Sequence, residues 1–214
     1  MLGRDINLHE VAATSDAAVY LYDKTLDVTW LRNSFGNGAS SPVNWNAASA
    51  WAANLVTGSG GNAISDWRLP TMAAPALACN FSYGGTNCGF NPATSSSEMA
   101  SLFYSTLGNK AYYDTNGDAQ AVYGLTNTGS FQNMQSGYHW LGTEYAPSVA
   151  GDAWYFVTNV GNQSASSKNS LLYAMAVHSG DVMAPVPEPE TYAMLLAGLG
   201  VIGAVARRRK LVAR

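Results

Sequence analysis

The sequence predicts an α+β domain with two helices and a small antiparallel sheet, followed by a C-terminal transmembrane helix. Three observations carry this prediction. Apolar residues recur at helical spacing in two segments of the first half of the chain, and the second half returns to the period-two alternation of strands. An uncharged run then lies close to the C-terminus. Because the helices come early and the strands late, the domain belongs to the α+β class.

The first expected elements are a hairpin and a helix. Residues 20–23 and 28–31 alternate apolar with polar side chains on both sides of a turn-forming segment, which is typical of a short hairpin. Asn44 is a good N-cap, and apolar residues recur at helical spacing from there to Leu55, before the glycine-rich segment 58–61. We therefore expect an amphipathic helix over this stretch.

A strand-like segment and a second helix follow. Residues 66–71 contain Pro70, which forces the backbone before it to be extended. The second helix is expected over residues 97–107, with Ser96 or Ser97 as its cap, an acidic residue in its first turn and Gly108 closing it.

The remaining elements are strands. Residues 138–141, 153–157 and 172–177 alternate as strands do, and we expect them to pair in one antiparallel sheet. The loops between them are rich in Gly, Asn and Ser. Residues 183–190 then form a linker that contains a Pro-Glu-Pro motif.

Composition limits the classes of function. A chain of 214 residues, less its C-terminal tail, provides one domain with a single core. Charged residues make up 12% of the whole chain, a low share that is typical of secreted proteins rather than cytosolic enzymes. The net charge of −3 includes a basic tail, so the rest of the chain is more acidic than the total. Nucleic acid is therefore not an expected partner.

The C-terminal tail contains an uncharged run followed by a basic cluster, as membrane-inserted segments do. Residues 191–206 form an uncharged run of 16 residues, which spans about 24 Å as a helix at 1.5 Å per residue and can insert into a bilayer. The basic cluster Arg207, Arg208, Arg209 and Lys210 follows it, within a cytoplasmic tail at 207–214. These charges resist translocation, so they hold the C-terminus in the cytoplasm and place the preceding domain outside.

The segment before the helix has the features of a processing site. Pro187 and Pro189 cannot continue a helix and keep Glu188 extended, as a processing enzyme requires. Together with the helix and the basic cluster, the motif Val186, Pro187, Glu188 and Pro189 closely resembles the PEP-CTERM sorting signal of Gram-negative bacteria. The resemblance implies an exosortase as partner, inner-membrane anchoring before processing, and a mature protein at the cell surface or outside the cell. An ordinary C-terminal tail anchor is the alternative.

The N-terminus does not read as a signal peptide. Residues 1–19 contain neither a basic n-region nor an apolar h-region, although the tail makes sense only for an exported chain. We therefore interpret them as a leader-proximal segment, with a signal expected upstream.

Several sequence blocks resemble the Lcl C-terminal domain family over residues 20–182. The most specific are Asp-Trp-Arg-Leu-Pro-Thr at 66–71 and Gly-Asp-Val at 180–182. The resemblance implies a fold similar to C-type lectins and no enzymatic activity. Two departures are an insertion at 72–94 and His178-Ser179, which stands where an arginine and a proline are usual.

Cys79 and Cys88 are the two cysteines, and they bracket a polar loop with a Gly-Gly turn. An even pair in an exported chain predicts a disulfide with a structural role. A metal or redox pair is the alternative, but it would need closer spacing and companion histidines.

No catalytic or metal constellation emerges, so we expect a non-enzymatic protein without cofactor or metal. His9, His139 and His178 lack spaced partners, and His139 is expected to point to solvent. Residues 114–118 begin like a calcium loop but lack the later glutamate, so a polar turn is the preferred interpretation.

Aromatic residues point to the most informative binding hypothesis. Most of the six tryptophans and twelve tyrosines belong to the core. Tyr112, Tyr113 and Tyr123, however, lie in a polar loop and can form a stacking platform for sugar rings. From the sorting tail and the lack of a catalytic constellation, we expect an exported binding or structural module, with exopolysaccharide as its partner. An extracellular hydrolase of matrix polysaccharide is the alternative, and it would need a carboxylate pair that the sequence does not reveal.

Overall fold

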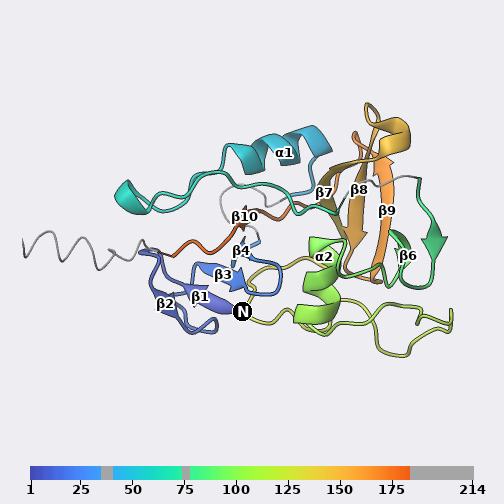
Figure 1. Ribbon diagram of the computed structural model, residues 1–214, viewed down its shortest axis with the longest axis horizontal. Coiled ribbons are helices and arrows are strands. Elements are labelled where there is room, and N and C mark those ends of the chain that lie inside the picture. The colour runs from blue at the N-terminus through green and yellow to red at the C-terminus, as the bar shows by residue number, and fades with distance from the viewer. Residues whose placement is uncertain (35–40, 74–77, 184–214) are drawn as a thin grey trace, which may run out of the picture. The chain divides into compact units, whose positions relative to one another are not determined.

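Two five-stranded β-sheets carry most of the regular structure in the computed structural model of the chain (Figure 1). The structure describes residues 1–34, 41–73 and 78–183. They belong to one unit, Met1–Met183, and the second unit is Ala184–Arg214. The expected transmembrane helix at 191–206 lies outside the described residues, and within them no helix has the length and apolar character needed to cross a membrane.

The first sheet is antiparallel throughout and contains the predicted hairpin. Its strands, in spatial order, are β10 (Val177–Ser179), β4 (Val28–Leu31), β3 (Tyr20–Asp23), β1 (Leu2–Arg4) and β2 (Glu10–Val11). Tyr20 pairs with Leu31 and Asp23 with Val28, so the prediction of a hairpin at 20–31 is confirmed.

Residues 1–19 are part of this sheet rather than a segment that precedes the domain. β1 pairs with β3, and β2 pairs with the outer edge of β1. The expectation that these residues lie outside the domain is therefore wrong. Strands of three and two residues are too short for alternation to reveal them, which is why the sequence pattern gave no sign of them.

The second sheet combines antiparallel strands with one parallel pair. Its spatial order is β5 (Phe81–Ser82), β6 (Cys88–Phe90), β9 (Asn162–Ser167), β8 (Asp152–Val157) and β7 (Tyr138–Glu144). β5 and β6 are parallel, and the other neighbours are antiparallel. β7 and β8 confirm two expected strands. β9 was missed because its sequence, Asn-Gln-Ser-Ala-Ser-Ser, has almost no apolar residues.

The prediction of a third strand at 172–177 in this sheet is wrong. Leu172 and Tyr173 form isolated bridges to Val43 and His139, and the strand itself begins at Val177 and pairs with β4 of the first sheet. This apolar run passes from one sheet to the other. Its period-two pattern arises because the segment is buried where it passes between the sheets, and not because the segment is one continuous strand.

Residues 66–71 are also not a strand, because Arg68 makes an isolated bridge to Val177 without a continuing ladder. The segment is held by side chains. Arg68 donates from Nη1 and Nη2 to the two carboxylate oxygens of Glu98 at 2.7 Å each, and the amide of Thr71 donates to the same carboxylate.

Both predicted helices are present. α1 spans Trp45–Ala53, and the Asn44 side chain accepts a hydrogen bond from the Ala47 amide, as expected of an N-cap. α2 is a single turn at Glu98–Ala100 capped by Ser97, and it continues as a π-helix, η3 (Ser101–Thr106). Gly108 follows with a φ of 68°. Two short 3₁₀ turns, η2 (Gly60–Asn62) and η4 (Ala146–Ser148), lie in the loops.

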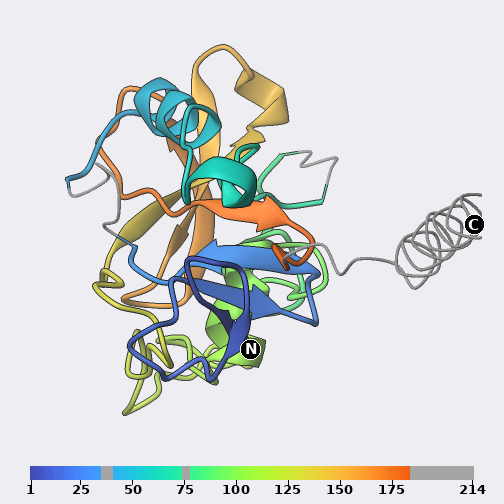
Figure 2. The same ribbon diagram turned by 90° about the vertical axis from the view of Figure 1, so that its left-hand side faces the viewer.

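The two helices cover opposite faces of the second sheet. Ala48 and Ala52 of α1 pack with Trp140 and Ala153, whereas the neighbouring strand residues belong to the core that contains α2 and η3. Successive strand residues point to opposite faces, so the two helices are on different sides. Figures 1 and 2 both show α1 near the top of the view and α2 well below it.

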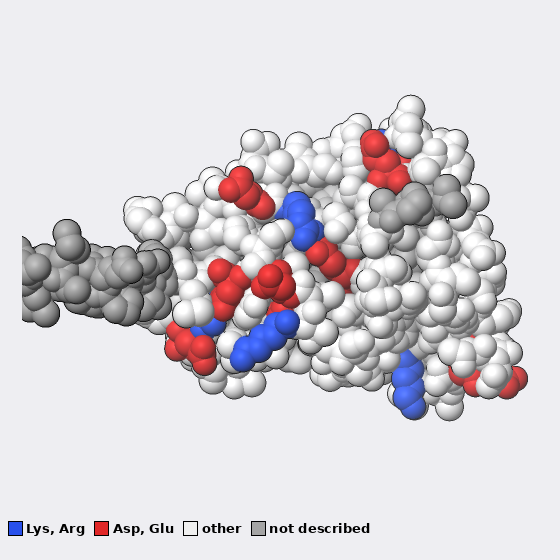
Figure 3. Space-filling view, viewed as in Figure 1, with Lys and Arg blue, Asp and Glu red and all other residues white. Residues whose placement is uncertain are grey.

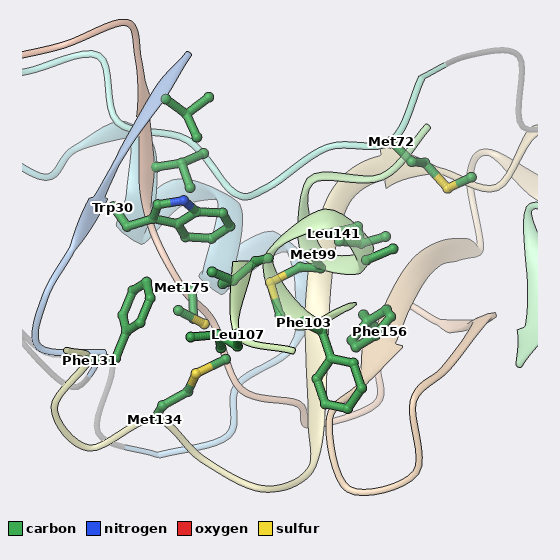
Figure 4. Close-up of a cluster of buried hydrophobic side chains, with 14 of the residues drawn as sticks. Trp30, Met72, Met99, Phe103, Leu107, Phe131, Met134, Leu141, Phe156 and Met175 are labelled. Atoms are coloured by element: carbon green, nitrogen blue, oxygen red, sulfur yellow. The ribbon is translucent and has the colours of Figure 1, made fainter. Parts of the chain in front are cut away.

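The main core joins the two sheets through α2 and η3. Figure 4 shows Trp30 of β4, Phe103 of η3 and Phe156 of β8 converging on the methionine side chains of the cluster. The core therefore requires both sheets at once.

Candidate functional site

Six aromatic rings gather at the β5 end of the second sheet, and we call them the aromatic patch. They are Phe81, Tyr83, Phe90, Tyr112, Tyr113 and Tyr123. Each ring contacts at least one other, with centroid distances between 4.6 and 6.1 Å. The rings come from two segments that are separated by α2 and η3 in the sequence. The fold therefore brings together a surface that neither segment forms alone.

A disulfide and a close strand pair position the first segment. Cys79 and Cys88 are bridged, which confirms the predicted disulfide, and the loop between them carries Phe81 and Tyr83. β5 lies inside this loop and runs parallel to β6, which begins at Cys88. Gly89 has a φ of 96°, and a Cβ atom there would overlap the carbonyl oxygen of Ser82. Only glycine permits this approach of β5 to β6 without strain.

A hairpin-like loop positions the second segment. Tyr113 bridges to Ala119, and Lys110 bridges to Gly124. The amide of Tyr112 donates to the carbonyl of Val160 at 2.8 Å, which attaches the loop to the turn between β8 and β9.

The tip of this loop is the segment that we compared with a calcium loop. Oδ1 of Asp114 accepts hydrogen bonds from the amides of Asn116 and Asp118, and these bonds hold the pKa of Asp114 below its usual range. The carboxylate is thus engaged by its own turn. This geometry agrees with the interpretation as a polar turn.

Asn91 ties the two segments together. Its Nδ2 donates to the carbonyl oxygens of Tyr83 and Tyr113, at 2.8 and 2.9 Å. Its own backbone is left-handed, with a φ of 47°, and its amide donates to the Tyr104 hydroxyl. That hydroxyl donates in turn to the carbonyl of Gly161, and burial raises the pKa of Tyr104. The side-chain amide of Asn91 therefore sets the distance between the two aromatic segments.

The outer rings of the patch are open to solvent. Phe81, Tyr83 and Tyr123 have exposed fractions of 56%, 39% and 40%. Most neighbouring rings meet at interplanar angles above 70°, so the patch presents ring faces and ring edges in alternation. Tyrosine hydroxyls add hydrogen-bonding groups beside the apolar surface. Such a surface fits a ligand with apolar C–H faces and many hydroxyls, which is the chemistry of a sugar chain.

The surroundings of the patch carry little charge. Lys110, Asp114 and Asp118 are the ionisable residues of the loop that bears Tyr112, Tyr113 and Tyr123 other than the tyrosines themselves. Figure 3 shows that the visible described face is mostly uncharged, with scattered acidic and basic groups rather than one charged field. Electrostatic attraction of a highly charged polymer is therefore not the dominant interaction available here.

Sequence analysis identified half of this patch. Tyr112, Tyr113 and Tyr123 lie together as proposed, whereas Phe81, Tyr83 and Phe90 were missed. Their signal was present: two aromatic residues, two positions apart, lie inside a polar loop closed by cysteines. In extended backbone, such spacing places both rings on one side of the chain.

The histidines do not assemble into a site. His9 is exposed near Asp5, His178 lies against Trp67 with ring centroids 5.8 Å apart, and His139 is on β7. The prediction that His139 points to solvent is wrong: it is 1% exposed, because the segment that contains Tyr173 lies against it, with the two ring centroids 5.6 Å apart. Within the described ranges, no group of three or more His, Cys, Asp or Glu residues is placed to hold a metal ion.

Comparison with known proteins concerns the tail alone. Residues 185–210 match the PEP-CTERM protein-sorting motif, a stretch that includes Val186 to Pro189 and the basic cluster from Arg207 to Lys210. These residues lie outside the described part of the structure. Signals of this class are exosortase substrates and imply export to the cell envelope. No curated protein and no solved structure matches the chain.

Proposed function

We propose that this exported, exosortase-processed protein binds polysaccharide of the cell envelope or extracellular matrix through the aromatic patch, and that it does so without catalysis. The observation that carries the proposal is the continuous set of ring contacts from Phe81 to Tyr123, with its outer rings exposed. A soluble domain gains nothing in stability from leaving such rings in water. Exposed aromatic groups of this kind are typical of binding surfaces.

The arrangement favours neutral chains of sugar rings. Ring faces stack on the C–H faces of sugars, and the hydroxyls of Tyr83, Tyr112 and Tyr123 can exchange hydrogen bonds with sugar hydroxyls. The loss of one such ring is expected to weaken binding by about 1–1.5 kcal/mol, or roughly tenfold.

Affinity electrophoresis tests the proposal directly. The full chain in detergent would migrate through gels that contain dextran, laminarin or hydroxyethylcellulose. At least one polymer should retard it, and Phe81→Ala, Tyr83→Ala and Tyr123→Ala should each weaken that retardation roughly tenfold. Tyr138→Ala is the matched control, because Tyr138 is 47% exposed but lies on β7, the opposite edge of the sheet from β5. Equal retardation of all four variants would reject the patch as the binding surface.

The hydrolase alternative requires product formation. Incubation with the polymer that binds should release no new reducing ends if the protein is a binding module. Release that survives Tyr83→Ala but is lost on substitution of a carboxylate would favour the hydrolase.

The destination of the protein is part of the same proposal. In this proposal the uncharged run at 191–206 inserts and anchors the precursor in the inner membrane, with the basic cluster in the cytoplasm, until cleavage near Glu188 or Pro189. The motif match supports the processing step. Mass spectrometry of the mature C-terminus is the test, and a C-terminus at Arg214 in the envelope fraction would contradict it.

We also retain the Lcl-like, C-type-lectin-like assignment as a proposal for the domain. It is supported by the ion pair of Arg68 with Glu98, which holds the 66–71 block that carries the resemblance against α2. An experimental structure whose topology differs from that of C-type lectins would reject it.

A further inference from the structure

We infer that the aromatic patch is completed by formation of the Cys79–Cys88 disulfide, so that polysaccharide binding is switched on by oxidation when the chain leaves the cytoplasm. This inference rests on the proposed function for its consequence, but its structural step can be tested separately. It concerns the most exposed ring of the first segment, Phe81, which lies inside the loop that the disulfide closes.

The first half of this loop depends on the disulfide. Apart from the bridge, residues 79–82 are held by the two-residue pairing of β5 with β6 and by a few hydrogen bonds, among them that of the Cys79 amide to the Tyr145 hydroxyl at 3.1 Å. A parallel pair of two residues is weak by itself. When the bridge is open, Phe81 therefore loses its fixed place beside Phe90.

The second half of the loop is anchored independently. Asn91 binds the carbonyl of Tyr83, and Gln163 donates from Nε2 to the carbonyl of Asn87 at 2.8 Å. Gln163 is fully buried, so this anchor does not depend on the loop tip. Reduction is thus expected to release residues 79–82 while the core and the loop that carries Tyr112, Tyr113 and Tyr123 remain folded.

The chemistry of the switch is disulfide exchange. Two thiols lose two electrons and two protons to the disulfide of an oxidant, either a small molecule or a protein dithiol/disulfide pair, which is reduced to its two thiols. Thiols remain reduced in the cytoplasm and are oxidised outside the inner membrane. The export that the sorting motif implies therefore takes the chain from the state with an open loop to the state with a closed one.

Binding measurements test the consequence. The oxidised full chain in detergent should bind its polymer from the dextran, laminarin and hydroxyethylcellulose set, and dithiothreitol should weaken that binding at least tenfold, reversibly. The double variant Cys79→Ser/Cys88→Ser should bind as weakly as the reduced protein and should not respond to dithiothreitol. Near-UV circular dichroism verifies that the variant is folded. A folded variant that binds like the parent would overturn the inference.

Hydrogen exchange tests the structural step without any ligand. Amides of residues 79–82 should exchange at least tenfold faster in the reduced protein, whereas peptides that cover 112–123 should be unchanged. Unchanged exchange at 79–82 would overturn the inference even if the polymer binds. If exchange rises as expected but the oxidised protein binds no polymer, the proposed function fails and the disulfide-dependent ordering stands.

Discussion

At the residue scale, the aromatic patch depends on two positions where the backbone conformation restricts which residue can be present. Gly89 sits at the closest approach of β5 to β6 with a positive φ, and Asn91 adopts a left-handed conformation two residues later while it binds both aromatic segments. Left-handed backbone is costly for most residues and is kept where the surrounding structure requires it. Both residues therefore serve the geometry of the patch.

Gly89→Ala should displace β5 from β6. The new Cβ would overlap the Ser82 carbonyl oxygen and would also force alanine into a left-handed conformation, at a cost of about 1–3 kcal/mol. We expect a lower thermal midpoint and weakened polymer binding. Gly85→Ala is the matched control, because Gly85 also has a positive φ, 73°, but has open space around its Cβ position. An effect of equal size at both positions would show that backbone strain, and not β5 displacement, is responsible.

His139 predicts how stability depends on pH. Burial lowers the pKa of His139 from 6.5 to about 4, so the folded state disfavours its charged form. The unfolded chain then binds more protons between these values. Stability is complete above pH 6.5 and falls as the pH drops towards 4, by at most about 3 kcal/mol.

Urea unfolding between pH 7 and pH 4 measures this effect. His139→Phe should flatten the profile in this window, and His9→Asn, on the exposed surface, should leave it as in the parent. The carboxyls of Asp5 and Asp114 have pKa values held below 3.8, so their contributions are lost at lower pH. A profile that stays steep in His139→Phe would show that another group controls it.

At the element scale, the N-terminal strand is joined to the end of the domain by an ion pair. Arg4 of β1 is 1% exposed and binds both carboxylate oxygens of Asp181, at 2.9 and 2.6 Å, and also contacts Glu10 of β2. Hydrogen bonds to Asp181 raise the pKa of Arg4 further above its usual range. Asp181 belongs to the Gly-Asp-Val block that precedes the linker. This ion pair therefore joins the first sheet to the C-terminal end of the domain.

Asp181→Ala should therefore destabilise the domain by about 3 kcal/mol, because it leaves a buried guanidinium with a single exposed partner. Glu10→Gln is the control, since the Glu10 side chain is 61% exposed and its pair with Arg4 contributes little. Chemical unfolding of both variants measures the difference. Equal stabilities would mean that Arg4 is adequately satisfied by solvent.

Elements with a local signal were predictable, and those without one were not. Asn44 and Ser97 indicated where the two helices begin, because an N-cap residue forms its hydrogen bond within the first turn. The hairpin at 20–31 was predictable because its strands are sequence neighbours. β9 and β1 lack such signals, since polar or very short strands form only where a partner strand already offers hydrogen bonds.

At the scale of the whole molecule, sorting should depend on the tail alone. Pro187→Ala/Pro189→Ala would let a helix extend backwards through Glu188 and hide the extended backbone that a processing enzyme needs. We expect the uncut precursor to accumulate in the inner membrane. Cell fractionation with immunoblotting measures the size and place of the protein. The control Pro185→Ala lies outside the Pro-Glu-Pro triplet and should be processed as the parent.

The basic cluster tests the other half of the signal. Neutral residues at Arg207, Arg208 and Arg209 would remove the positive charges that we propose to hold the C-terminus in the cytoplasm, and the uncharged run before them should then cross the membrane completely or insert in the wrong orientation. Delivery of both tail variants to the cell exterior in normal size and amount would refute the sorting mechanism.

The sequence by itself determined the features that depend on residues close together in the chain: the sorting motif, the disulfide, the helix caps and the hairpin. Tertiary structure decided which apolar run joins which sheet, as residues 172–177 show by crossing between two sheets. It also decided that His139 is buried and that Phe81, Tyr83 and Phe90 complete the patch with three distant tyrosines. The physical reason is common to these cases. Local signals act through hydrogen bonds and charges within a few residues, whereas burial and surface contacts depend on which distant segments the core brings together.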